Sequence, residues 1–95
     1  MKVKITKLKY DKKKYKAEFF DKNNKKIKTT KFGATGYLDH TIGATKEQRD
    51  RYRARHRKDP INDKFTAGAL SYHVLWNTKS IRKNIELYKK RFNLN

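Results

Sequence analysis

The stretch Phe65-Thr66-Ala67-Gly68-Ala69-Leu70-Ser71-Tyr72-His73-Val74-Leu75-Trp76 decides the fold of this chain. Its apolar side chains fall on nearly all sides of a helical projection, which predicts a helix over 65–76 that is buried almost all round. We therefore expect this helix to be the central element of a small, aromatic-rich core. A chain of 95 residues has room for one such core and hence for one domain.

A helix with a single apolar stripe is predicted after this segment. Asn77 and Thr78 interrupt the central helix, and Ser80 can cap a last helix over 80–92. Four large apolar side chains then recur at helical spacing: Ile81, Ile85, Tyr88 and Phe92. This spacing is typical of a surface helix that packs one stripe against a core.

The helix before the central segment is predicted by its start and stop signals. Thr45 followed three residues later by Gln48 fits a capping box, which predicts a helix over 46–58. The pair Asp59-Pro60 would end it, because the residue before a proline avoids helical geometry.

Residues 2–33 have the period-two alternation of strands. Apolar side chains and charged ones take opposite faces, as in Tyr15-Lys16-Ala17-Glu18-Phe19. The alternation slips near Lys7, which indicates a bulge or a strand end, and polar turns interrupt it at 11–14 and 21–24. The simplest assembly is a three-stranded antiparallel meander with one buried face and one face rich in lysine.

A glycine-rich loop over 33–45 joins this sheet to the helices, and we expect Tyr37 and Leu38 to attach it to the core. Runs of strands followed by runs of helices are typical of the α+β class. The predicted fold is therefore a three-stranded antiparallel β-meander followed by three α-helices, with the sheet in 1–33, the helices in 46–92 and one domain over 1–95.

The charge of the chain is far from balanced: 27 Lys and Arg stand against 9 Asp and Glu, a net charge of +18. Self-repulsion at this density opposes compaction, so a partner that neutralises it is the natural explanation. Residues 1–31, 46–58 and 79–91 carry the excess, whereas the predicted core helix does not. This pattern indicates a folded cationic surface whose partner is nucleic acid, an anionic membrane or an acidic protein.

The helix over 46–58 is the most specific of these segments. On a helical projection Lys46, Arg49, Arg53 and Arg57 share one arc, Arg51, Arg55 and Lys58 share a second, and Tyr52 lies between them as the expected anchor to the core. Arginine offers a planar fork of donors that suits phosphate oxygens, and only two acids lie in this segment. We therefore predict phosphate contacts, first from Arg49, Arg53 and Arg57 and then from Arg51, Arg55 and Lys58. A solvated helix face is the alternative.

The remaining candidate contacts are less specific. Lys13, Lys25 and Lys26 lie in or beside the predicted turns and can contact phosphates, or can equally be charges that discourage edge-to-edge pairing of the sheet. Arg82 and Lys83 on the last helix are expected to combine phosphate contacts with an ordinary solvated helix face.

Catalytic and cofactor motifs are not found. The chain has no Cys, and the spacing of its three histidines matches no zinc pattern. Asp39 beside His40 is the one acid–histidine pair worth naming, which leaves a metal-dependent nuclease as a minor alternative. Gly33 and Gly36 lack the ending of a phosphate-binding loop.

No signal peptide or membrane span is evident, so we expect a soluble, intracellular, non-enzymatic protein without cofactor, metal or small-molecule substrate.

Three segments carry a resemblance: the run from Lys31 to Thr41, the pattern Arg49-x-x-Tyr52-x-x-Arg55-His56, and Leu75-Trp76-Asn77 with Ser80-Ile81. Over about residues 31–92 the chain resembles a family of small uncharacterised proteins of nucleocytoplasmic large DNA viruses. Members of that family often have a His-Lys-Asp-like step after the threonine, where this chain has Ile42-Gly43-Ala44-Thr45. The resemblance implies a viral gene product in the virion or viral factory, but no activity.

These observations favour a non-enzymatic, largely sequence-independent double-stranded DNA-binding protein, and the viral resemblance adds a possible role in compacting or packaging a genome. RNA binding is the first alternative, because phosphates dominate both interactions. A virion structural protein that binds an acidic protein is the second. A membrane partner is disfavoured because the basic helix lacks a wide apolar face.

Overall fold

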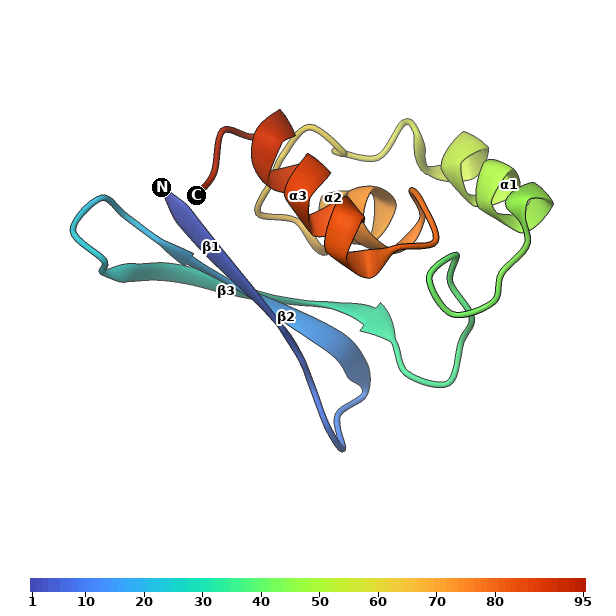
Figure 1. The fold of residues 1–95 in the computed structure, drawn as a ribbon, viewed down its shortest axis with the longest axis horizontal. Coiled ribbons are helices and arrows are strands. Elements are labelled where there is room, and N and C mark those ends of the chain that lie inside the picture. The colour runs from blue at the N-terminus through green and yellow to red at the C-terminus, as the bar shows by residue number, and fades with distance from the viewer.

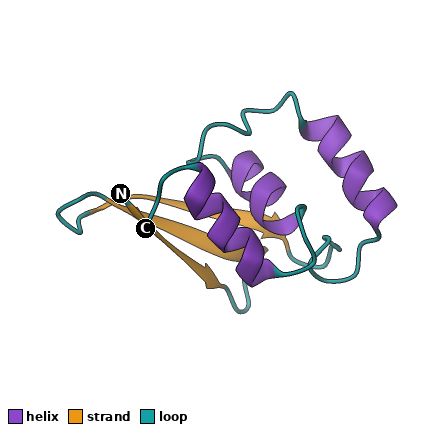
Figure 2. Cartoon of the chain, turned by 45° about the horizontal axis from the view of Figure 1, so that its top comes forward, coloured by secondary structure: helices purple, strands orange, loops and turns teal.

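Three antiparallel strands form one layer of the structure, and the helices lie on one face of it (Figures 1 and 2). The computed structural model describes residues 1–95. The strands, in the order β1-β2-β3, are β1 (Lys2–Lys7), β2 (Lys13–Phe20) and β3 (Lys26–Ala34). The helical segments are α1 (Lys46–His56), α2 (Ala67–Leu70), the π-helix η1 (Ser71–Leu75) and α3 (Ile81–Arg91). Because η1 continues α2 directly, the three predicted helices and the α+β class are confirmed.

The register of the sheet follows from its alternating side chains. Val3 pairs with Phe19, and Tyr15 pairs with Phe32, so these side chains share the face that the helices cover. The opposite face has no helix over it and carries lysines, among them the cross-strand pair Lys16 and Lys31. β1 ends at Lys7, where the sequence pattern slips, whereas the irregularity in register lies between β2 and β3, beside Phe20.

The segment α2–η1 is the buried centre of the molecule, as its all-round apolar pattern predicts. Leu70 and Val74 have no exposed surface, and they pack with Phe19 and Phe32 of the sheet. On the other side lies α3, whose Tyr88 is buried and donates a hydrogen bond from its hydroxyl to the Lys64 carbonyl oxygen at 2.6 Å.

The prediction of a continuous α-helix over 65–76 is wrong in its detail. The helix begins at Ala67, because the Thr66 hydroxyl accepts a hydrogen bond from the Ala69 N–H and so caps it. From Ser71 it widens into a π-helix, in which the Trp76 N–H donates to the Ser71 carbonyl oxygen at 3.1 Å. A segment that is apolar on all sides has no polar face from which its period can be identified.

The two ends of the chain lie side by side (Figure 1). The Val3 N–H donates to the Asn95 carbonyl oxygen at 3.1 Å, and the Asn95 N–H donates to the Met1 carbonyl oxygen at 3.0 Å. The last residue therefore covers part of the free edge of β1. None of the helices combines the length and the apolar character that a membrane span needs.

Candidate nucleic-acid interface

Helix α1 stands at the end of the molecule, away from the turn between β2 and β3, and buries none of its residues (Figure 1). Its start is the predicted capping box: the Gln48 N–H donates to Thr45 Oγ1 at 3.1 Å, and the Thr45 N–H donates to Gln48 Oε1 at 2.8 Å. These local bonds explain where α1 begins, but a helix of 11 residues with no buried side chain needs other contacts to hold it to the body.

Two arginines provide those contacts. Arg53 Nη1 donates to the carbonyl oxygens of Tyr72 and Trp76 at 3.1 and 2.9 Å, and Arg49 Nη1 donates to that of Asn77 at 3.0 Å. The Tyr72 carbonyl belongs to η1 and those of Trp76 and Asn77 directly follow it, and at a helix end backbone acceptors lack partners within the helix and the helix dipole favours a cation. Burial lowers the pKa of the Arg53 guanidinium, which also lies over the Tyr72 ring at 4.0 Å.

A stack of rings is the second attachment of α1. Tyr52 lies 4.3 Å from Trp76, centroid to centroid, with only 8° between the two planes, and His56 follows at 4.2 Å on the tyrosine. Burial raises the pKa of the Tyr52 hydroxyl. The predicted anchor role of Tyr52 is therefore realised through Trp76, which is itself only half-buried, and not through the closed core.

The other basic side chains of α1 and its end have no partner inside the molecule. They are exposed and make neither a hydrogen bond nor an ion pair: Lys46, Arg51, Arg55, Arg57 and Lys58. The only ion pair between an arginine and an acid on α1 joins Arg49 to Asp50 at 2.9 Å. Arg51 and Arg55 also line a surface hollow of about 570 Å³, whose wall includes Trp76.

The contacts inside the molecule divide the arginines differently from the predicted order, because Arg49 and Arg53 are bonded whereas Arg57 of the same group is free. The arc that contains Arg49 and Arg53 faces the end of η1, because those guanidinium groups find backbone acceptors there. The second arc, with Arg51 and Arg55, faces away from these carbonyls and keeps its donors free. Contact of any of these residues with phosphate stays a prediction, but the free donors are those of Arg51, Arg55 and Arg57.

The structure does not bring all predicted contact residues together. Lys25 and Lys26 lie at the turn between β2 and β3, at the opposite end of a molecule 42 Å long, and Lys26 pairs with Glu18 at 3.3 Å (Figure 1). Lys13 is exposed at the start of β2. On α3, Arg82 lies 3.8 Å from Glu86, whereas Lys83 is exposed and unpaired.

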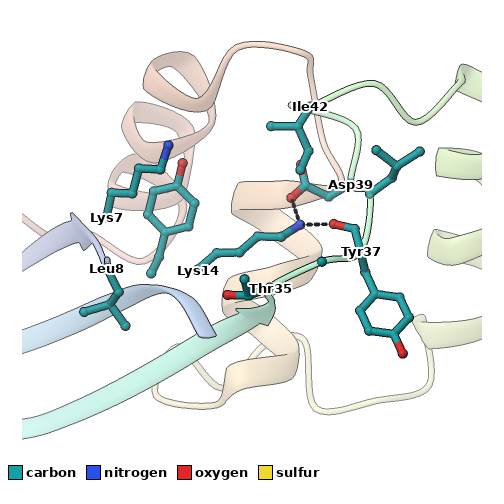
Figure 3. A pocket seen from close by; sticks show the side chains of 10 residues that line it. Lys7, Leu8, Lys14, Thr35, Tyr37, Asp39 and Ile42 are labelled. Atoms are coloured by element: carbon teal, nitrogen blue, oxygen red, sulfur yellow. Dashed lines mark hydrogen bonds and ion pairs between the residues drawn. The ribbon is translucent and has the colours of Figure 1, made fainter. Parts of the chain in front are cut away.

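The loop that follows β3 is held by polar side chains, and the prediction that Tyr37 and Leu38 attach it to the core is wrong. Tyr37 is 72% exposed and Leu38 is 56% exposed, whereas Asp39 and His40 are buried. Lys14 of β2 supplies the ammonium group that pairs with Asp39 at 2.7 Å and donates to the Tyr37 carbonyl oxygen (Figure 3). A buried carboxylate with an ion partner holds this loop, so its apolar side chains remain outside.

The pair Asp39 and His40 has a structural role. Asp39 Oδ2 pairs with Lys14, and Asp39 Oδ1 accepts from the backbone N–H and the hydroxyl of Thr41. His40 Nδ1 donates to the Ala44 carbonyl oxygen at 2.8 Å, and the His40 N–H donates to that of Leu75 at 3.1 Å. Nowhere does the structure gather three His, Asp or Glu side chains in reach of one metal ion.

The sequence analysis expected Trp76 and Tyr37 in the core, whereas Trp76 is only half-buried, Tyr37 is 72% exposed, and both line a hollow with Tyr52 of α1. Burial of Trp76 was expected because it belongs to the apolar segment 65–76. One signal was present: Trp76 directly precedes the Asn77-Thr78 break, and a large aromatic ring at the end of a helix is less enclosed than one in its middle.

The comparisons with known proteins give a family and no function. The sequence profile of a family described as "Family of unknown function (DUF5754)" matches residues 3–56, from β1 to the end of α1. Neither a curated protein nor a solved structure matches the chain.

Proposed function

The chain belongs to the DUF5754 family, and we propose that it is a non-enzymatic protein that binds double-stranded DNA through the phosphates, with little sequence preference. One observation supports this proposal above the others: Arg51, Arg55 and Arg57 are exposed and unpaired on a helix that Arg49 and Arg53 attach to the body. The helix that carries the free cationic groups is thus held in place before any ligand arrives.

The chemistry of these groups suits phosphate. A guanidinium forms charge-assisted, often bidentate hydrogen bonds to phosphate oxygens and loses less hydration than an ammonium group. Arg51 and Arg55 are four residues apart, and like charges at this spacing destabilise a helix by about 0.2–0.5 kcal/mol. A bound phosphate removes this repulsion, so a ligand of regularly spaced phosphates stabilises the arrangement that the free protein merely tolerates.

The salt dependence of binding tests the proposal. Each phosphate neutralised contributes about 0.9 to the slope of log K against log salt, so six to eight contacts give about −5 to −7. Changing Arg51, Arg55 and Arg57 together to Gln should flatten the slope for a DNA duplex by about two to three units.

A charge-matched variant provides the control. Replacing Lys22, Lys25 and Lys26 with Gln removes three charges at the far turn, and we expect it to change the slope by less than one unit. Equal effects of the two variants would show a diffuse charge effect instead of a site on α1.

The same titration separates the competing partners. A matched RNA duplex that binds more tightly than the DNA would change the assigned nucleic acid. Polyglutamate that displaces the DNA at equal charge concentration would instead favour an acidic protein partner. Compaction or packaging of a viral genome is the role that such binding would serve if the viral resemblance holds.

A further inference from the structure

Three surface hollows beside α1 and the loop that follows β3 share lining residues, and we treat them together as one groove. Its middle part, of about 280 Å³, is lined by Tyr37, Leu38, Tyr52 and Trp76. Trp76 is shared with the hollow of about 570 Å³ beside Arg51 and Arg55. At the other end, Tyr37 and Leu38 are shared with a hollow of about 330 Å³ that reaches Lys7 and Leu8 (Figure 3).

Aromatic side chains form the middle of this groove. Trp76 and Tyr52 are stacked on each other, so the indole is already held in one orientation. Tyr37, on the opposite side, is largely exposed, and its ring points away from the ion pair of Lys14 and Asp39 (Figure 3). The Trp76 indole N–H makes no hydrogen bond within the molecule and is not fully buried.

The charged side chains of the groove that have no ion partner are all cationic. Asp39 is its one carboxylate, and Lys14 neutralises it at 2.7 Å. Arg51 and Arg55 at one end and Lys7 at the other are exposed, and none of the three has an ion partner. The groove thus combines flat apolar rings with uncompensated positive charges at both ends.

We propose that this groove binds single-stranded nucleic acid, with bases stacked on Tyr37 and Trp76 and backbone phosphates held by Arg51, Arg55 and Lys7. Exposed rings within a cationic channel are the features by which proteins hold unpaired strands, since every base has a π-face and every linkage has a charge. An apolar peptide would leave the arginines uncompensated, and an acidic one would supply no flat faces.

This inference rests on the proposed function and extends it. A duplex offers phosphates to the outward side of α1 but keeps its bases stacked inside. The groove begins at Arg51 and Arg55 and adds a place for bases, so these arginines lie at the point where a duplex would pass into an unpaired stretch. The preferred ligand is therefore an overhang, gap or junction.

Trp76 is the only tryptophan of the chain, which makes its fluorescence a direct report on the groove. We would titrate the full chain with oligothymidylate, with oligouridylate and with an abasic oligonucleotide of the same length and phosphate number. The two strands with bases should quench the tryptophan emission, and the abasic strand should bind without comparable quenching. A stronger effect of one of the first two identifies DNA or RNA as the source.

A pair of tyrosine variants measures the contribution of stacking. Tyr37→Ala should weaken binding of the single strand about five- to 150-fold, the range expected for one stacked base. Tyr10→Ala is the matched control, because Tyr10 is fully exposed in the turn between β1 and β2, outside the groove, and its loss should leave the affinity unchanged. Both side chains are exposed, so neither change removes a core contact.

The outcomes separate the two proposals. If neither duplex nor single strand binds, the proposed function fails. If both bind, but the abasic strand quenches as strongly as the others and the two tyrosine variants behave alike, the groove proposal is wrong and phosphate binding stands. If polyglutamate quenches Trp76 as the oligonucleotides do, the groove accepts an acidic peptide and the proposal is likewise overturned.

Discussion

Helices α1 and α3 have the same length, 11 residues, and the same kind of start, with a hydroxyl side chain at the N-cap, yet they are held to the molecule by opposite means. α3 buries Asn84 and Tyr88 and packs Ile81 and Ile85 against the core. α1 buries nothing and is attached by arginine–carbonyl bonds and a ring stack. The difference teaches that the density of basic residues alone does not identify a candidate binding helix. What identifies it is which of its basic side chains bond within the molecule and which remain without a partner.

Asn84 shows how completely α3 belongs to the fold. Its side-chain oxygen accepts from the N–H and the hydroxyl of Thr78, and its amide nitrogen donates to the carbonyl oxygens of Val74 and Thr78. A buried amide with its capacity satisfied fixes the position of α3 against η1. α1 has no such residue, so its local unfolding should cost less free energy than that of α3.

The largest expected effect comes from truncating the same residue type on the two helices. Tyr88→Ala on α3 removes a buried ring and its hydrogen bond to Lys64, and should cost about 3–5 kcal/mol of unfolding free energy. Tyr52→Ala on α1 removes the stacks on Trp76 and His56, outside the closed core, and should cost only about 1–2 kcal/mol.

Urea unfolding followed by circular dichroism measures both values. Folded domains of this size have about 5–15 kcal/mol of stability in total, so the tyrosine-to-alanine change on α3 should remove a large part of it. Equal losses at the two positions would contradict the view that α1 lies outside the core.

The sequence predicts the fold well where one physical rule determines each element. Alternation determined β2, the hydroxyl caps determined the starts of α1 and α3, and Asn24 takes the positive φ of 61° expected of asparagine in a turn. The π-helix was not predictable, since a segment that is apolar on all sides shows no hydrophobic periodicity from which the type of helix can be identified.

The candidate site was less predictable because its contacts are remote along the chain. The sequence identifies the arginines, but Arg53 bonds to carbonyls 19 and 23 residues away, and Arg49 to one 28 residues away. Residue types do not show which backbone carbonyl groups at a helix end are free to accept a hydrogen bond. For the same reason, the exposure of Tyr37 follows from the buried pair of Lys14 and Asp39, which are 25 residues apart.

A smaller effect sharpens the difference between the two arcs of α1. Arg53→Met removes the bonds to Tyr72 and Trp76 and leaves their carbonyls without this donor, and should cost about 1–3 kcal/mol. Arg55→Met is the matched control, because Arg55 has no intramolecular partner, and its loss should stay within about 0.5 kcal/mol.

The affinity for a DNA duplex should depend more on Arg55 than on Arg53, which is the reverse of the order expected for stability. Arg55→Met should weaken DNA binding at moderate salt, and Arg53→Met should do so less at temperatures where it is folded. Thermal unfolding and gel-shift titration of the two proteins measure both quantities. A destabilised Arg55→Met protein with normal DNA affinity would restore the original ranking of the arginines.

The smallest expected effect is a response to acid on the α3 side. His73 is buried against Phe92, with ring centroids 5.4 Å apart, and its Nε2 donates to the Ile61 carbonyl oxygen at 2.8 Å. Burial lowers the pKa of His73 below the ordinary 6.5, and the charges of Arg91 and Arg53 act in the same direction, whereas the Ile61 bond opposes them. The folded protein therefore binds a proton less readily than the unfolded chain.

The sign of the pH dependence follows from this difference. Stability from His73 is complete above pH 6.5 and decreases as the pH falls from there toward the lower folded-state pKa. The melting temperature should thus be lower at about pH 5.5 than at about pH 7.5, and His73→Gln, which keeps a donor for Ile61, should show a weaker dependence. All other acid-sensitive groups are the same in the two proteins, so their contributions cancel in the comparison. Equal dependence in the two proteins would mean that acid acts elsewhere, and the contact of η1 with α3 would then not be the acid-sensitive one.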